Sequence, residues 1–170
     1  PWFESTYKPG QEITDEKAYG EPLVYALMSP PYMGRTSSLA TMLSVGANTK
    51  HPEEAVKFLY MINSNKELYN LLCFGIEGKH YTKNEDGTIK LVEGSGYEGM
   101  ATKAWAMGNQ FNAYVMEGQP LDVWELTEKM NDESQKSPAL GFVPDLANLT
   151  TEVAAIANVQ AEYKAKRECG

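Results

Sequence analysis

One uncharged stretch of this chain concentrates the side chains best suited to holding a ligand. It runs from Trp105 through Gly108 to Asn109, Gln110, Phe111, Asn112, Ala113 and Tyr114. Amides donate and accept hydrogen bonds, as sugar hydroxyls do, and aromatic rings pack on the apolar C–H faces of sugars. The stretch therefore predicts the binding, without cleavage, of a polyhydroxylated ligand, with Trp105, Asn109, Gln110 and Tyr114 as candidate contacts.

The same stretch also has a structural interpretation. Aromatic residues at helical spacing commonly belong to a core, and the amides of Asn109 and Gln110 could cap helix ends that break near Gly108. Replacing both amides with Ala separates the two interpretations, because a ligand site loses affinity whereas a packing motif loses stability.

Two further candidates come from a proline-flanked loop that begins at Pro30. Tyr32 adds an aromatic face, and Arg35 is either a bidentate contact for a ligand or carboxylate, or a surface arginine. Trp124 lies one turn into an amphipathic segment, so it is interpreted as packing, with a ligand platform as the alternative.

The elements that must position these residues begin with a lead-in. Residues 1–22 are rich in Pro, Gly, Glu and Lys with little apolar periodicity, which predicts an extended or weakly ordered linker. Apolar runs at 23–28 and 39–45 predict two strands around the proline loop. Residues 23–170 are then taken as one domain.

Helical periodicity begins after Lys50. Pro52 suits a first helical turn, and the predicted buried face is Ala55, Phe58, Leu59 and Ile62. A second helix is predicted between a Ser64 cap and a Gly75 stop, with an apolar stripe formed by Leu68, Leu71 and Leu72. The two helices would form a hairpin.

The remaining segments alternate turns and helices. Asp86-Gly87 predicts a tight β-hairpin turn between 80–82 and 88–92. Residues 100–114 predict a helix broken or bent near Gly108, and Asp122 with Glu125 predicts a capping box. A loop over 134–145 precedes a last helix over about 149–166, whose predicted buried stripe is Leu149, Val153, Ile156, Val159 and Tyr163. The pattern predicts an α/β to α+β, helix-rich fold.

Composition narrows the classes of function. The chain has 170 residues, 15 Lys plus Arg against 23 Asp plus Glu, and a formal net charge of -8. This acidic balance argues against a nucleic-acid partner, and no stretch approaches the roughly 20 apolar residues of a membrane span. The two cysteines define no disulfide framework.

The sequence contains no clear pattern for a catalytic site or a metal site. His51 and His80 have no second ligand at metal spacing, so neither a metal nor a cofactor is predicted. Glu77, Glu93, Glu98 and Glu117 each precede a glycine and are interpreted as turn residues, not as the paired carboxylates of a glycosidase.

Longer motifs resemble a known family. Residues 44–59, SVGANTKHPEEAVKFL, are similar to the strand, loop and helix of extracellular solute-binding proteins of ABC importers. Residues 69–72, 75–81, 108–111 and 137–142 look like the C-terminal domain of a lipoprotein branch of that family, of the family 1, carbohydrate type. The resemblance extends from about Leu23 to the end of the chain.

The resemblance implies a fold and a function. The fold would be the C-terminal part of a two-lobed, type II periplasmic-binding-protein-like structure, with residues 1–22 entering from the missing N-terminal lobe. The function would be extracellular capture of a solute, expected to be an oligosaccharide, and delivery to ABC permease subunits. The full-length protein would touch the membrane only through a lipid anchor on its outer face.

Two alternatives of other classes remain open at the sequence level. A glycoside-processing hydrolase domain would lose activity when Glu77, Glu98 or Glu117 is changed to Gln. A structural interaction domain would bind no solute even when the full-length protein is screened at saturating concentrations.

Overall fold

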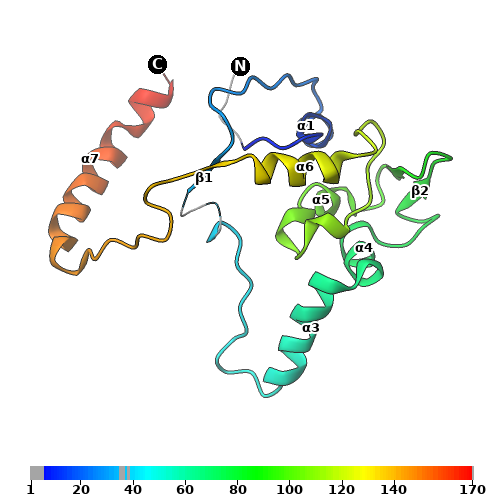
Figure 1. Ribbon diagram of the computed structural model, residues 1–170, viewed down its shortest axis with the longest axis horizontal. Helices are drawn as coiled ribbons and strands as arrows, with labels where there is room; N and C mark the ends of the chain where they lie inside the picture. Colours follow the sequence, from blue (N-terminus) through cyan, green and yellow to red (C-terminus); the bar gives the residue numbers. More distant parts are fainter. Residues whose placement is uncertain (1–5, 35–36, 38, 170) are drawn as a thin grey trace. The chain divides into compact units, whose positions relative to one another are not determined.

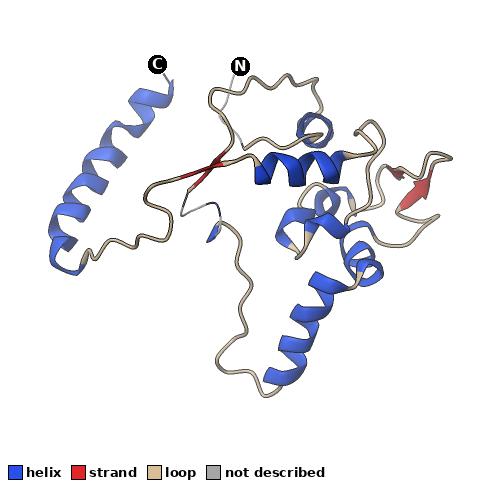
Figure 2. Ribbon diagram, viewed as in Figure 1, coloured by secondary structure: helices blue, strands red, loops and turns tan. Residues whose placement is uncertain are grey.

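The computed structural model describes residues 6–34, 37 and 39–169, in two compact units. The first unit covers residues 1–137 and the second covers 138–170. Helices predominate, and the described strands form two small two-stranded sheets (Figure 2). None of the described helices is long and apolar enough to cross a membrane. A helix-rich composition was predicted from the sequence.

Figure 1 labels the α-helices named below and the strands β1 and β2. The first unit contains α1 (Gln11–Tyr19), β1 (Tyr32–Met33), α3 (Pro52–Ser64), α4 (Lys66–Phe74), β2 (Tyr81–Lys83), β3 (Ile89–Leu91), α5 (Glu98–Ala101), the 3-10 helices η1 (Ala104–Ala106) and η2 (Gln110–Asn112), α6 (Val123–Asp132) and β4 (Gln135–Lys136). The second unit contains η3 (Ala147–Leu149) and α7 (Thr150–Cys169).

The α3–α4 hairpin forms where the sequence predicts it. Pro52 opens α3, because its missing N–H would have no helical partner at that position. The cap of α4 is Asn65, whose Oδ1 accepts from the Leu68 N–H at 2.9 Å. Ser64, the predicted cap, instead donates to the Tyr60 carbonyl at 2.9 Å. The cap prediction is wrong by one residue, since Asn65 is the first residue with extended backbone.

The buried face of α4 differs from the predicted leucine stripe. Tyr69, Asn70, Cys73 and Phe74 are buried, whereas Leu71 is exposed. The Tyr69 hydroxyl donates to the Ala104 carbonyl at 2.7 Å, so polar bonds to distant backbone select this face. The face joins a cluster of buried residues: Tyr69, Cys73, Phe74, Tyr81, Ile89, Ala101, Ala104, Ala113 and Met116. On α3, Ile62 is buried but Phe58 is exposed, so its predicted stripe is only partly correct.

The β2–β3 hairpin confirms the turn prediction. The strands are antiparallel, with Tyr81 opposite Leu91 and Lys83 opposite Ile89. Gly87 has a φ of 84°, the left-handed value that the turn requires.

The two strands predicted at 23–28 and 39–45 do not form. The short strand β1 lies in the predicted proline loop and pairs in parallel with β4. Val24 is 98% exposed, so the apolar run at 23–28 lies in loop without a neighbouring strand. A strand is stable only beside a partner that pairs its backbone groups, and the described residues offer neither run such a partner.

The lead-in is not extended throughout. Helix α1 occupies Gln11–Tyr19 between two glycines with left-handed backbone, Gly10 and Gly20. The Gln119 amide donates to the Gly10 carbonyl at 3.1 Å and to the Thr14 hydroxyl at 3.3 Å. The helix is held by residues more than a hundred positions away, which local periodicity cannot reveal. The assignment of 1–22 as an inter-lobe linker remains a prediction.

The segment predicted as a helix broken or bent near Gly108 consists of three short pieces, α5, η1 and η2. The break between η1 and η2 falls at Gly108, which has a φ of 152°. A Cβ on Gly108 would lie 2.8 Å from the Ile62 carbonyl oxygen, so close backbone approach requires glycine there. The predicted break near Gly108 is confirmed.

Helix α6 begins after Asp122 as predicted, but the predicted capping box does not form. The Asp122 side chain makes no cap hydrogen bond. Its backbone carbonyl starts the helix by accepting from Leu126 at 2.9 Å. The buried face is Val123 and Thr127, while Leu126 is exposed.

The second unit is dominated by α7, which confirms the predicted last helix. Its apolar residues follow helical spacing, but each is 43–59% exposed, so the predicted burial of this stripe is wrong. The stripe is Leu149, Val153, Ile156, Val159 and Tyr163. Spacing fixes which residues share a face, but only a covering surface can bury that face.

Candidate functional site

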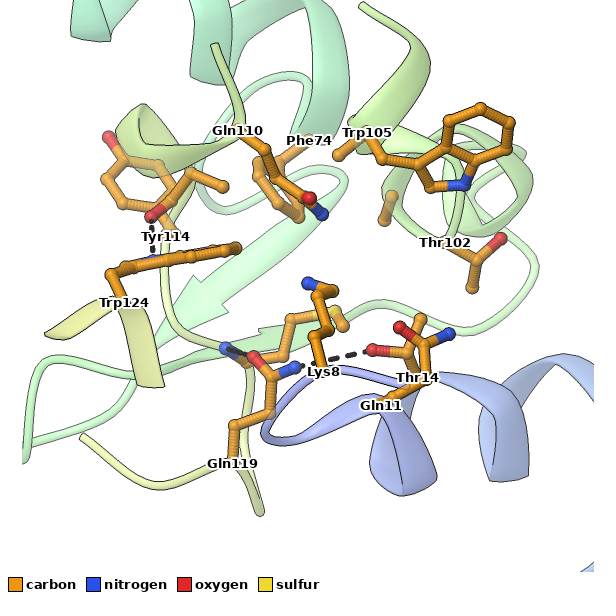
Figure 3. Close-up of a pocket in the computed structure, with 14 residues that line it drawn as sticks. Lys8, Gln11, Thr14, Phe74, Thr102, Trp105, Gln110, Tyr114, Gln119 and Trp124 are labelled. Atoms are coloured by element: carbon orange, nitrogen blue, oxygen red, sulfur yellow. Dashed lines mark hydrogen bonds between the residues drawn. The ribbon is translucent and has the colours of Figure 1, made fainter. Parts of the chain in front are cut away.

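Three of the predicted site residues meet in one groove of the first unit. Trp105 comes from η1, Gln110 from η2, and Tyr114 from the segment that follows (Figure 3). The groove is lined by Lys8, Gln11, Thr14, Phe74, Ala101, Thr102, Ala104, Trp105, Gln110, Ala113, Tyr114, Met116, Gln119 and Trp124. Amides, hydroxyls and aromatic rings dominate, as expected for a surface that meets hydroxyl groups.

Trp105 is presented on a fixed base. Its side chain is 53% exposed. The preceding Ala104 carbonyl accepts from the buried Tyr69 hydroxyl, and Gly108 closes the other end of the turn against α3. Figure 3 shows the Trp105 indole at one end of the groove, away from Trp124. An exposed indole on fixed backbone is a suitable platform for an apolar sugar face.

Trp124 lines the groove and also has a structural role. Its indole N–H donates to the Ala113 carbonyl at 2.9 Å, and its ring is 6.0 Å from Phe111 at 57°. The ammonium of Lys8 lies 4.7 Å from the Trp124 ring centroid, a cation–π contact. The structure therefore contains the packing role predicted for Trp124 and places the ring in the groove wall.

Tyr114 is held between the groove and the core. Its ring centroid is 5.9 Å from that of Phe74 and 5.6 Å from that of Tyr81. Burial, together with the hydrogen bond to Tyr114, raises the pKa of Tyr81 to about 12. The Tyr81 phenol is therefore a neutral hydrogen-bonding group near neutral pH.

Side-chain amides fix the backbone of residues 112–114. The Asn70 side chain donates to the Asn112 carbonyl at 2.8 Å and accepts from the Tyr114 N–H at 2.9 Å. The Asn112 side chain donates to the Asn63 carbonyl at 3.1 Å. Asn109 accepts from the Phe111 N–H at 3.2 Å and caps η2. The capping interpretation of the amide-rich run thus describes Asn109, while Gln110 lines the groove.

Tyr32 and Arg35 are not part of the described groove. Tyr32 is 57% exposed and lines a separate cavity of about 910 Å³ between the 23–32 loop and the end of α6. Arg35 lies outside the described residues.

The groove is too small to enclose a ligand by itself. Its volume is about 20 Å³, whereas cavities that bury small molecules measure roughly 300–1,000 Å³. The surface can therefore serve as one wall of a site, but it cannot serve as the whole site.

Lys8 dominates the electrostatics of the groove. Burial lowers its pKa to about 8, and the nearby charge of Asp15 partly opposes this shift. No sequence pattern selects Lys8, Gln11, Thr14 or Gln119, because the first three fall in the predicted linker and Gln119 is in a turn.

Carboxylates and histidines form no reactive cluster here. Glu77 pairs with Lys83 at 2.7 Å, and Glu98 accepts from the Ser95 N–H at 3.1 Å. The Glu98 backbone N–H is the main cause of a lowered Glu98 pKa. Glu117 lies 3.6 Å from the amine of Lys90. In the described part of the chain, no three His, Cys, Asp or Glu side chains gather in a way that could hold a metal.

Comparison with known proteins assigns the fold to the periplasmic-binding-protein-like solute-binding proteins. The chain is homologous to part of a carbohydrate ABC transporter substrate-binding protein of Streptococcus pneumoniae serotype 4. Identity is 32% over 130 residues, which are 76% of this chain and 26% of the relative. No protein-family model matches the sequence.

Solved structures give the same assignment. The N-glycan transport solute binding protein NgtS of Streptococcus pneumoniae matches with a TM-score of 0.63 and 28% identity, over 77% of this chain and 29% of that chain. Its complex with Man1GlcNAc matches with a TM-score of 0.55 and 30% identity, over 70% and 27% of the two chains. The predicted resemblance and fold class are confirmed, and the chain spans about a quarter of the length of these relatives.

Proposed function

We propose that this chain is the C-terminal lobe of an extracellular solute-binding protein that captures an oligosaccharide and delivers it to the permease subunits of an ABC importer. The observation that carries the proposal is 32% identity to a carbohydrate substrate-binding protein over 76% of the chain. The structure of the relative NgtS was solved in complex with Man1GlcNAc and with Man5GlcNAc. We therefore propose an oligosaccharide as the ligand of this protein.

In this proposal the groove is one wall of a cleft between two lobes. Its volume of about 20 Å³ leaves the ligand open on the other side. A second lobe, residing in the part of the protein that this chain does not span, would supply the opposite wall and close by hinge motion. The closed form would then be the one that the permease recognises.

The proposed ligand contacts follow from their placement. Trp105 offers an exposed ring face, and Gln110 and Tyr114 offer polar groups beside it. Asn109 would act at the rim of the groove. Tyr32, in β1, and Arg35, which lies outside the described residues, remain proposed contacts. The protein would be non-catalytic, with no cofactor, since capture and release require no covalent step.

Localisation follows from the same assignment. A substrate-binding protein of an importer works on the outer side of the membrane. We place the full-length protein there, held by a lipid anchor that lies outside this chain.

Titration calorimetry tests the two-lobed site. The 170-residue chain should give little heat with Man5GlcNAc and related oligosaccharides, because it provides only half of the contacts. The intact protein that contains this chain should bind at least one of them. Tight binding by the isolated chain would contradict the half-site arrangement, and no binding by the intact protein would contradict the proposed function.

Alanine variants of the intact protein test whether Trp105 contacts the ligand. Trp105→Ala should weaken binding at least tenfold without changing the unfolding midpoint, because the indole is half exposed. Phe58→Ala, which removes an exposed aromatic side chain from α3 outside the groove, is the matched control. Equal effects of the two variants would remove Trp105 from the site.

A further inference from the structure

We infer that the groove is built for an oligosaccharide that carries a carboxylate, which docks on the ammonium group of Lys8. The inference rests on the proposed function and specifies its substrate class.

The position of Lys8 is the first observation. Lys8 is the one residue with a formal charge at neutral pH among the described residues that line the groove. Figure 3 shows its amine projecting from the start of α1 into the middle of the groove, between Trp124 and the residues around Gln110. No described Asp or Glu lines the groove, so the described part of its wall contains no charge that would repel an anion.

The second observation is that this ammonium has no anionic or hydrogen-bonding partner among the described residues. Its contact is with the face of the Trp124 ring, whose centroid lies 4.7 Å from the Lys8 amine. Asp15 acts on it only at longer range. Both Asp15 oxygens are already engaged, one by the Gln11 amide at 2.8 Å and the other by the Tyr25 hydroxyl. As far as the described residues are concerned, the three donors of the ammonium therefore remain available for a ligand.

Physical chemistry connects these observations to an acidic ligand. A buried charge is costly unless an opposite charge or hydrogen bonds compensate it. Burial lowers the pKa of Lys8 to about 8, so the amine is still mainly charged at neutral pH but poorly solvated. A ligand carboxylate would supply both the charge and the acceptors, whereas a sugar hydroxyl supplies only an acceptor.

The neighbouring side chains suit the rest of such a ligand. Gln11, Thr102 and Gln110 present amide and hydroxyl groups around Lys8, and Trp105 presents an aromatic face at the end of the groove. An acidic sugar needs this combination of one cation, neutral hydrogen-bonding groups and an aromatic ring.

A glycan array of neutral oligosaccharides and their uronic-acid counterparts, probed with the intact protein that contains this chain, tests the inference. The acidic member of a pair should bind at least about tenfold more tightly than its neutral counterpart. Lys8→Met should abolish that preference and Lys8→Arg should retain it. Lys129→Met, which removes an exposed lysine from α6, is the matched control and should change nothing.

Other outcomes overturn the inference in recognisable ways. Equal binding of neutral and acidic sugars would show that the Lys8 ammonium does not recognise the ligand carboxylate. A preference for acidic sugars that persists in Lys8→Met would show the same. Tighter binding of neutral sugars by Lys8→Met would show that Lys8 covers the Trp124 ring. In each of these cases the proposed function stands, whereas an absence of binding across the array would refute that function and this inference with it.

Discussion

Replacing Asn70 with Ala should remove the main support of the groove segment. The side chain lies on α4 and is 2% exposed. It donates to the carbonyls of Lys66 and Asn112, both at 2.8 Å, and accepts from the Tyr114 N–H at 2.9 Å. The bonds to Asn112 and Tyr114 cross more than forty residues of sequence and join α4 to the residues that end at the groove.

The size of the stability loss follows from the backbone groups that Asn70→Ala leaves without a hydrogen-bond partner. The Lys66 carbonyl belongs to the helix ladder of α4 and keeps a helical partner. The Asn112 carbonyl and the Tyr114 N–H would each lose their partner, and a buried unsatisfied group costs about 1–3 kcal/mol. The Asn70→Ala variant should therefore lose roughly 2–4 kcal/mol of unfolding free energy.

Urea unfolding of the 170-residue chain, followed by circular dichroism, measures this loss. Hydrogen exchange adds a local measurement, since the Tyr114 amide should lose its protection. The matched control is Asn63→Ala, which removes only the exposed bond from the Asn63 side chain to the Leu59 carbonyl, 2.7 Å long. That control should cost less than about 0.5 kcal/mol. If Asn70→Ala costs no more than the control, the amide does not hold the segment and the reasoning is wrong.

Three other perturbations follow from single contacts. Gly75→Ala should lower the unfolding free energy by more than about 2 kcal/mol, because Gly75 has a φ of 78° and a Cβ there would lie 2.2 Å from His80 Nδ1. The control Gly87→Ala, at a φ of 84° with open space around it, should lower it by only about 1 kcal/mol. Equal midpoints of the two variants in thermal unfolding would refute this steric argument. Gln119→Ala should lower the unfolding free energy by about 1–2 kcal/mol and speed limited proteolysis within α1, since Gln119 is hydrogen-bonded to that helix and its cap. An unchanged cleavage rate would show that α1 is held by other contacts. Burial lowers the pKa of Lys8 to about 8 from 10.5, so between these pH values the unfolded chain keeps a proton that the folded chain has released. The unfolding free energy should therefore rise with pH across this window, and this rise should disappear in Lys8→Met. An identical slope of unfolding free energy against pH in both proteins would contradict the lowered pKa.

Part of the candidate site could be predicted because its side chains are close in sequence. Trp105, Gln110 and Tyr114 fall within ten residues, and the break at Gly108 brings them to one surface. Lys8 lies about a hundred residues away from them. No local pattern connects it to Trp124, so the charge of the groove could be seen only in the folded chain.

Elements with local sequence signals could be predicted without the structure. Pro52 starts α3, and Gly87 turns the β2–β3 hairpin, because each residue restricts or permits backbone angles at its own position. Longer motifs also indicated the family, since they preserve strand, loop and helix in a fixed order.

Tertiary structure alone decided which faces are buried and which distant groups meet. Asn70 and Tyr69 turn the polar and aromatic face of α4 inward because their hydrogen bonds to remote backbone outweigh the apolar pattern of the leucines. The run at 23–28 stays without a strand partner, and α1 forms because Gln119 reaches it. Hydrogen bonds and burial depend on neighbours in space, whereas sequence patterns report only neighbours along the chain.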